Sequence, residues 1–160
     1  MPKLSDSGMQ LVKGLEGWSA TSYKDIAGKL TIGYGHLIKA DETFDEPISE
    51  TLGEQILFTD LQAAVNAVLH FISVSLSDNQ FSALVSLVYN EGNPPLVGTL
   101  GQKLNSKDYQ GAAEEFDKWV YIHDPYTGMP EKSKGLIARR AKERALFETA
   151  DADNDNGQNS

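Results

Sequence analysis

Apolar residues recur at helical spacing over several stretches of this chain. The first helix is expected from Ser5 or Asp6 to Glu16, because either residue at its start can cap a helix. A longer stretch, 49–72, is long enough to cross between two lobes, and 77–89 is apolar enough to be the central helix of a helical lobe. The remaining helices are expected at 97–104, at 108–120, and from Lys132 or Ser133 to Thr149.

Residues 21–36 show a different pattern, in which strand-forming side chains surround a turn. Asp25 to Gly28 supplies the turn chemistry, so this stretch predicts a small antiparallel hairpin or meander. Residues 41–47 are interpreted as an acidic loop, and 90–95 as a break after the central helix. Residues 121–130 are rich in turn formers and predict an irregular loop.

The length of 160 residues suits one domain with a sizeable core, or two small lobes that share a helix. A hydrophobic fraction of 40% and a charged fraction of 23% are typical of a soluble globular protein. No apolar run approaches the roughly 18 residues of a membrane span, and the N-terminus has no apolar signal core, so we expect no stable membrane insertion. Residues 151–160 predict a disordered acidic tail.

The charge and the residue content exclude several classes of function. A formal net charge of −9 argues against nucleic acid as the main partner. With no cysteine there is no disulfide framework and no thiolate chemistry. The three histidines lie far apart without paired ligand spacing, so no metal site and no cofactor are expected.

Glu16 is the first candidate for chemistry. It lies between Val12 and Met9 at the edge of the apolar face, in the last turn of the first helix. Partial burial and the helix dipole both favour its protonated form, which a general acid needs. The alternative is a solvent-facing glutamate at a frayed helix end.

Two arginines interrupt the apolar face of the last helix. Arg140 and Arg144 project in the middle of that face, where a guanidinium needs a carboxylate partner or must reach the surface along its stem. We predict that Arg140 pairs with Glu16 and holds its carboxyl at the junction of the lobes. The alternative is an arginine paired with some other acid at the edge of the core. The six bases between 132 and 144 are interpreted as a solvated face rather than a binding surface.

Asp25 and Thr31 follow Glu16 at short intervals, one at the predicted turn and one in the predicted strand. Two carboxyl groups on facing elements suit glycoside hydrolysis, with one protonated and the other ionised in a wetter place. The Thr31 hydroxyl could hold a water molecule beside Asp25. Taken singly, Asp25 is equally an Asx-turn residue and Thr31 a strand former.

These residues carry a resemblance to a known family, the phage-type lysozymes of glycoside hydrolase family 24. The spacings of Glu, Asp, Thr and His match, and the resemblance covers about residues 4–147. The matching segments are Glu16-Gly17, Tyr23-Lys24-Asp25, Leu30 to Leu37, Asn79 to Leu84, Tyr89 to Gly92, Tyr109 to Phe116 and Gly135 to Arg140.

The resemblance implies an α+β fold, mostly α, of the lysozyme type. A small antiparallel sheet lobe (about 15–50), a long connecting helix, and a larger helical lobe (about 70–150 plus the N-terminal helix) would form one domain over 1–150. It also implies a muramidase that hydrolyses the β-1,4 bond between N-acetylmuramic acid and N-acetylglucosamine of peptidoglycan. The reaction is expected to invert the configuration at the sugar.

The resemblance also implies roles for single residues. Glu16 would be the acid, while Asp25 and Thr31 would position or activate water. His36 would be structural, with Asp60 on the long helix as its partner. The residues expected to contact substrate are Leu37, Tyr89, Thr99 and Arg140.

As a phage or prophage endolysin the protein would act as a monomer. It would stay in the host cytoplasm until lysis, then reach the periplasm and cell wall with the help of a separate holin. The rival interpretations are a wall-binding module without turnover, a tail-associated lysozyme domain, and a lytic transglycosylase, which needs the acid but not Asp25. Two departures from the family pattern, Asn93-Pro94-Pro95 and residues 121–130, affect the cleft rim and local substrate contacts.

Overall fold

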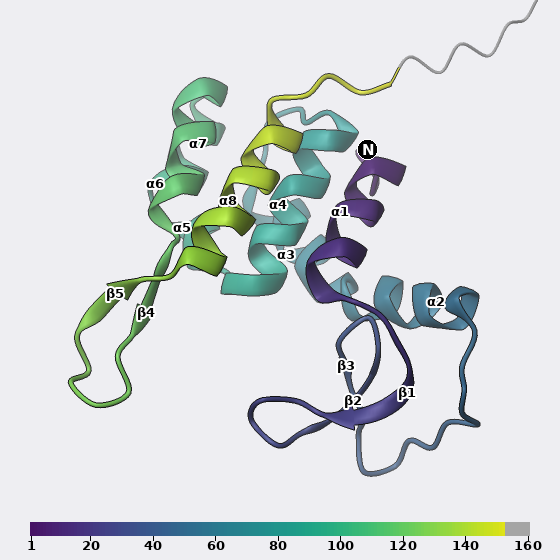
Figure 1. Ribbon diagram of the computed structural model, residues 1–160. Coiled ribbons are helices and arrows are strands. Elements are labelled where there is room, and N and C mark those ends of the chain that lie inside the picture. Colours follow the sequence, from purple (N-terminus) through teal and green to yellow (C-terminus); the bar gives the residue numbers. More distant parts are fainter. Residues whose placement is uncertain (153–160) are drawn as a thin grey trace, which may run out of the picture.

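The computed structural model describes residues 1–152 (Figure 1). The acidic tail predicted at 151–160 therefore lies outside the described residues from 153 onward. None of the helices within 1–152 has both the length and the apolar character needed to cross a bilayer. The helices are α1 (Asp6–Glu16), α2 (Glu50–Asp60), α3 (Gln62–Phe71), α4 (Asp78–Glu91), α5 (Pro94–Val97), α6 (Thr99–Asn105), α7 (Tyr109–Glu115), the 3₁₀ turn η1 (Phe116–Lys118) and α8 (Lys134–Phe147). The strands are β1 (Ser19–Lys24), β2 (Leu30–Gly33), β3 (His36–Leu37), β4 (Tyr121–His123) and β5 (Pro130–Lys132).

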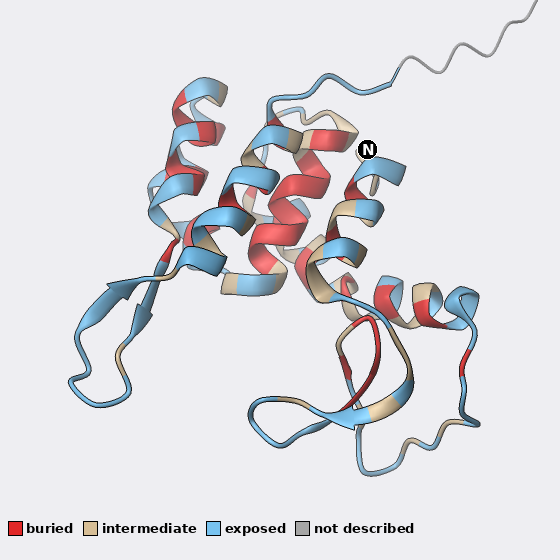
Figure 2. Ribbon diagram, in the orientation of Figure 1, coloured by how far each residue is buried: buried red, intermediate tan, exposed pale blue. Residues whose placement is uncertain are grey.

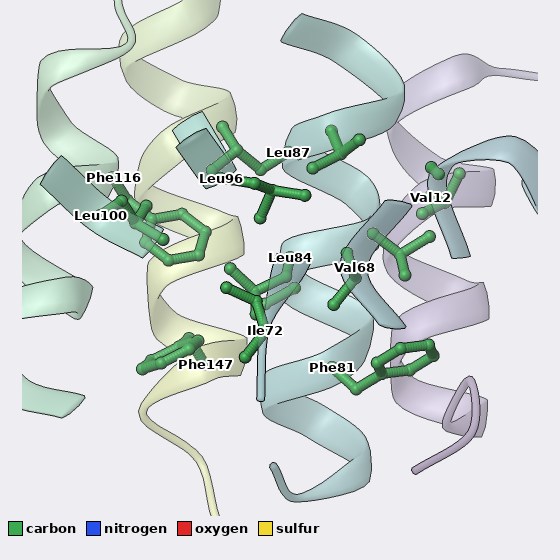
Figure 3. Close-up of a cluster of buried hydrophobic side chains, with 14 of the residues drawn as sticks. Val12, Val68, Ile72, Phe81, Leu84, Leu87, Leu96, Leu100, Phe116 and Phe147 are labelled. Atoms are coloured by element: carbon green, nitrogen blue, oxygen red, sulfur yellow. The ribbon is translucent and has the colours of Figure 1, made fainter. Parts of the chain in front are cut away.

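Helix α4 is the centre of the helical lobe, as its apolar sequence predicts. Its N-terminus is closed by a capping box, in which the side chains of Ser77 and Gln80 each accept a hydrogen bond from the other's backbone N–H. Figure 2 shows its turns buried among α1, α3 and α8. The core around it contains side chains from most of the helices of the lobe (Figure 3). They include Val12, Val68, Ile72, Phe81, Leu84, Leu87, Leu96, Leu100, Phe116 and Phe147.

The small sheet follows α1 directly, with antiparallel strands in the order β1-β2-β3. Thr31 of β2 pairs with Tyr23 of β1 on one side and with Leu37 of β3 on the other. Figure 1 shows this sheet next to α2, below the helices α1, α4 and α8. The predicted fold class, α+β with mostly helix and a small antiparallel sheet, is confirmed.

The connecting helix is not continuous, in contrast to the prediction of one helix over 49–72. It ends at Asp60 and resumes at Gln62, with the fully buried Leu61 between α2 and α3. The side chains of Thr59 and Gln62 donate to the carbonyls of Gln55 and Phe58, each at 3.0 Å. Such bonds compete with the backbone ladder, and they lie on both sides of the interruption.

The predicted irregular loop at 121–130 contains strands of a second hairpin, β4–β5, which projects from the helical lobe in Figure 1. The Asp124 carboxylate accepts backbone hydrogen bonds from Tyr126 at 2.8 Å and Thr127 at 2.9 Å. These bonds close the turn and lower the pKa of Asp124. The turn residues were recognised in the sequence, but the pairing of the short, exposed strands on either side of them was not.

Asp151, the first residue of the predicted tail, contacts the start of α4. Its carboxylate accepts hydrogen bonds from the backbone N–H groups of Asp78 at 2.9 Å and Asn79 at 2.7 Å. The Asn79 side chain in turn donates to the carbonyls of Thr149 and Ala150. An anion at a helix N-terminus is favourable, so these contacts attach the chain after α8 to α4.

Candidate active site

A cleft of about 500 Å³ lies where the end of α1, the sheet, and helices α2, α4 and α8 meet. Both lobes contribute to its walls, with charged and aromatic side chains around a glycine. The lining residues are Glu16, Gly35, His36, Leu37, Lys39, Asp60, Tyr89, Asn90 and Arg139. No group of three or more His, Asp or Glu side chains suited to a metal ion occurs within residues 1–152.

Glu16 is the last residue of α1, and its carboxyl faces this cleft. The helix ends there because Gly17 adopts a φ of 75°, which favours glycine. The Glu16 side chain is 21% exposed, as its place at the edge of the apolar face predicts. Gly35 leaves room for it, because a Cβ atom at Gly35 would lie 3.1 Å from Glu16 Oε2. The φ of Gly35, 74°, also favours glycine.

Arg139, not Arg140, pairs with Glu16, so the predicted partner was wrong by one position. The Nη1 atom of Arg139 lies 3.1 Å from Glu16 Oε1. Successive residues of a helix are about 100° apart, so Arg139 faces α1 while Arg140 faces the core. A sequence signal for Arg139 did exist, since Glu143 stands four residues later and can pair with it.

Arg140 is completely buried and does not line the cleft, contrary to the prediction that it contacts substrate. Its guanidinium lies 3.1 Å from Glu143 and 3.7 Å from Glu91, and it donates to the Asn90 side chain. Burial lowers the pKa of Arg140, while the two carboxylates favour its charged form. The alternative weighed in the sequence analysis, pairing with other acids, is what the structure shows.

Leu37 and Tyr89 line the cleft, whereas Thr99 does not. Thr99 is exposed at the start of α6. Burial raises the pKa of Tyr89 to about 12, and the charges of Asp60 and Glu16 add to this effect. The Tyr89 hydroxyl therefore keeps its proton at neutral pH and is available to a ligand as a hydrogen-bond donor.

His36 has the structural contacts that the family resemblance implied. Its Nδ1 lies 2.7 Å from Asp60 Oδ2, which confirms the predicted partner, and its Nε2 lies 3.1 Å from the Glu42 carboxylate. Burial alone would lower the pKa of His36, but the hydrogen bonds to Asp60 and Glu42 raise it overall. The His36 ring thus connects β3 to α2 and to the acidic loop.

This contact predicts a pH dependence of stability. The folded-state pKa of His36 lies above its ordinary value of 6.5, so the stabilisation is fully present below 6.5 and is lost as pH rises through the folded-state pKa. Chemical denaturation at a series of pH values should show the free energy of unfolding declining over that window. His36→Gln should remove this part of the decline, whereas His70→Gln, at an exposed position on α3, should retain it. An unchanged decline in His36→Gln would contradict the assignment.

Asp25 and Thr31 lie close to one another around Lys29, but neither lines the cleft that Glu16 faces. Asp25 Oδ1 accepts from the Lys29 N–H at 2.8 Å, and the Thr31 hydroxyl donates to the Lys29 carbonyl at 3.0 Å. Thr31 is buried, and its register partner Leu37 belongs to the cleft wall. The sheet therefore connects the turn of Asp25 to the cleft.

Known proteins resemble this chain both in sequence and in structure. The family model for phage lysozyme matches residues 13–143. Over 151 residues the chain is 39% identical to the endolysin of Acyrthosiphon pisum secondary endosymbiont phage 1. This match covers 92% of this chain and 99% of that protein. It is 35% identical to the endolysin of Salmonella phage P22, and that match covers 92% of this chain and 99% of the P22 protein. Among solved structures, the endolysin from Escherichia coli O157:H7 phage FAHEc1 matches with a TM-score of 0.82 and 30% identity, covering 94% of this chain and 97% of that one.

Proposed function

This chain belongs to the phage lysozyme family, and from that premise we infer that it is a peptidoglycan muramidase acting as a phage or prophage endolysin in host lysis. The bond cleaved is the β-1,4 link between N-acetylmuramic acid and N-acetylglucosamine. The observation that carries the inference is the Glu16 carboxyl at the wall of a cleft lined by both lobes. A glycan strand lying in that cleft would pass directly over this carboxyl.

In the proposed reaction Glu16 protonates the oxygen of the leaving sugar. Its carboxyl lies at the C-terminus of α1 and is only partly exposed to solvent. Once the proton has been transferred, the Arg139 guanidinium at 3.1 Å stabilises the carboxylate that remains. Leu37 and Tyr89 are proposed to contact the sugars, with Arg139 in the place that the sequence analysis gave to Arg140.

The proposed source of the attacking water is the Asp25–Thr31 pair. The Thr31 hydroxyl donates to Lys29, which leaves its lone pairs free to accept a hydrogen bond from water. Asp25 uses Oδ1 for the Lys29 N–H, and Oδ2 has no hydrogen-bond partner within residues 1–152, so it can act as the base. A carboxylate that activates water on the face opposite the acid inverts the configuration of the sugar.

The products of purified peptidoglycan test this function. Hydrolysis leaves a new reducing end on N-acetylmuramic acid, carries one oxygen from labelled water into it, and with inversion gives the α-anomer first. A lytic transglycosylase would instead leave anhydro-muramic ends and incorporate no label. A binding module would leave the glycan intact. Either of those results would contradict the proposal.

The remaining parts of the proposal concern the setting of the reaction. As an endolysin, the protein would accumulate as a monomer in the host cytoplasm and need a separate holin for release to the periplasm. Endolysins form the group of relatives that supports this setting. No cofactor has a role in the proposed reaction, since proton transfer and water activation use side chains only.

A further inference from the structure

Arg139 joins the carboxyl of Glu16 to a second, buried carboxyl on its own helix. Its Nη1 lies 3.1 Å from Glu16, its Nε lies 3.4 Å from Glu143 Oε2, and its Nη2 donates to the Ser86 carbonyl at 3.3 Å. A guanidinium presents its donors in a rigid plane. The two contacts made inside the lobe therefore fix the direction in which the third nitrogen meets Glu16.

Glu143 is held as firmly as the arginine it orients. Its side chain is completely buried, its Oε2 accepts from the Ser86 hydroxyl at 2.5 Å, and its Oε1 lies 3.1 Å from Arg140. Burial raises the pKa of Glu143, while Arg140, Ser86 and Arg139 favour its ionised form. Glu143 does not line the cleft, so it has no direct contact with a substrate there.

We propose that Glu143 is a positioning residue for the reaction, holding Arg139 against Glu16 and balancing the charge of that arginine. The proposal rests on the role of Glu16 as the general acid. An arginine whose charge is not balanced would favour the ionised form of Glu16, which cannot donate a proton. A Glu143 carboxylate next to Arg139 would offset this charge, so that the arginine contacts Glu16 without withdrawing the proton as strongly.

The other charged and titratable groups near Arg139 and Glu143 have contacts or positions of their own. On α8, Arg140 faces Glu143 directly, and on α4 Glu91 lies 3.7 Å from Arg140. Tyr89 of α4 and Asp60 of α2 lie on the cleft side, near Glu16. Of these groups, Glu143 is the carboxylate that contacts Arg139 from within the lobe.

The test is the pH profile of peptidoglycan hydrolysis by Glu143→Gln. The amide keeps the shape of the side chain but removes the charge that balances Arg139, so the alkaline limb of the profile should move to lower pH by about 0.5–1 unit. The Nε–H signal of Arg139 in the NMR spectrum should also change. Glu148→Gln is a matched control, because Glu148 pairs with Arg144 at the same i,i+4 spacing on the exposed side of the same helix. Its profile should match that of the parent protein.

A second variant keeps the proposal testable if Glu143→Gln does not fold. Ser86→Ala removes the hydroxyl that favours ionised Glu143 but keeps the backbone carbonyl that contacts Arg139. Its alkaline limb should move in the same direction by a smaller amount. The inference is overturned if the variants that fold have the parent's profile. A parent protein without any hydrolysis would instead contradict the proposed function, and the Arg139 Nε–H signal would then decide whether Glu143 orients Arg139.

Discussion

Replacing Glu16 by glutamine should reduce peptidoglycan hydrolysis by about 10²–10⁴-fold, the contribution typical of a positioned general acid. Glutamine has nearly the same shape as glutamate, but its amide cannot protonate a leaving sugar oxygen. The fold should remain, because the substitution weakens mainly the ion pair with Arg139, which is partly exposed to solvent. The loss of turbidity of purified peptidoglycan, with new reducing ends counted, measures the effect.

Glu54→Gln provides the control for this experiment. Glu54 belongs to α2 and pairs with Lys13 outside the cleft, so the same chemical change should leave the rate close to that of the parent protein. Circular dichroism and thermal unfolding establish that both variants are folded. Near-parental turnover by folded Glu16→Gln would end the assignment of Glu16 as the acid.

The second large effect is on stability, at Arg140. Arg140→Ala should lower the free energy of unfolding by about 3–5 kcal/mol, as expected when one partner of a buried ion pair is removed. The reason is that Glu143 would keep its buried carboxyl without the guanidinium at 3.1 Å, and Glu91 and Asn90 would also be left without this partner. Urea denaturation measures the change.

Arg144→Ala is the matched comparison on the same helix. Arg144 is 27% exposed and pairs with Asp117 and Glu148 at the surface, so its loss should lower the free energy of unfolding far less than the loss of Arg140. At temperatures where Arg140→Ala remains folded, its activity per folded molecule at acidic pH should stay near the parental value, because Arg139 makes the contact with Glu16. Its alkaline limb should move to lower pH as in Ser86→Ala, because Arg140 also favours the ionised form of Glu143. A specific loss of activity without a loss of stability would show that Arg140 acts in the cleft after all.

Much of the candidate site could be predicted from local sequence. The apolar stripe of α1 placed Glu16 at its edge, and Gly17 marked the end of the helix, because helical periodicity and glycine conformation are properties of short segments. The partner of His36 came from the family resemblance instead, since nothing local connects a residue of a short strand with an acid on a helix 24 residues later.

Other features of the fold depend on contacts that the spacing of apolar residues along the chain does not reveal. The pattern over 49–72 is helical throughout, yet the helix is interrupted at Leu61, between two side chains that bond to backbone carbonyls. The β4–β5 strands are short and exposed, so they have no alternation of apolar and polar residues for a prediction to detect.

The sequence by itself determined most of the helices, the small sheet, the carboxyl at the end of α1 and the presence of Arg140 on the buried side of α8. Only the tertiary structure decided which arginine meets that acid. Adjacent residues of a helix point about 100° apart, so the rotation of α8 against α4 and α1 selects between them. That rotation is set by the packing of whole helices, in which Arg140 and Glu143 are enclosed together and Arg139 is left facing Glu16.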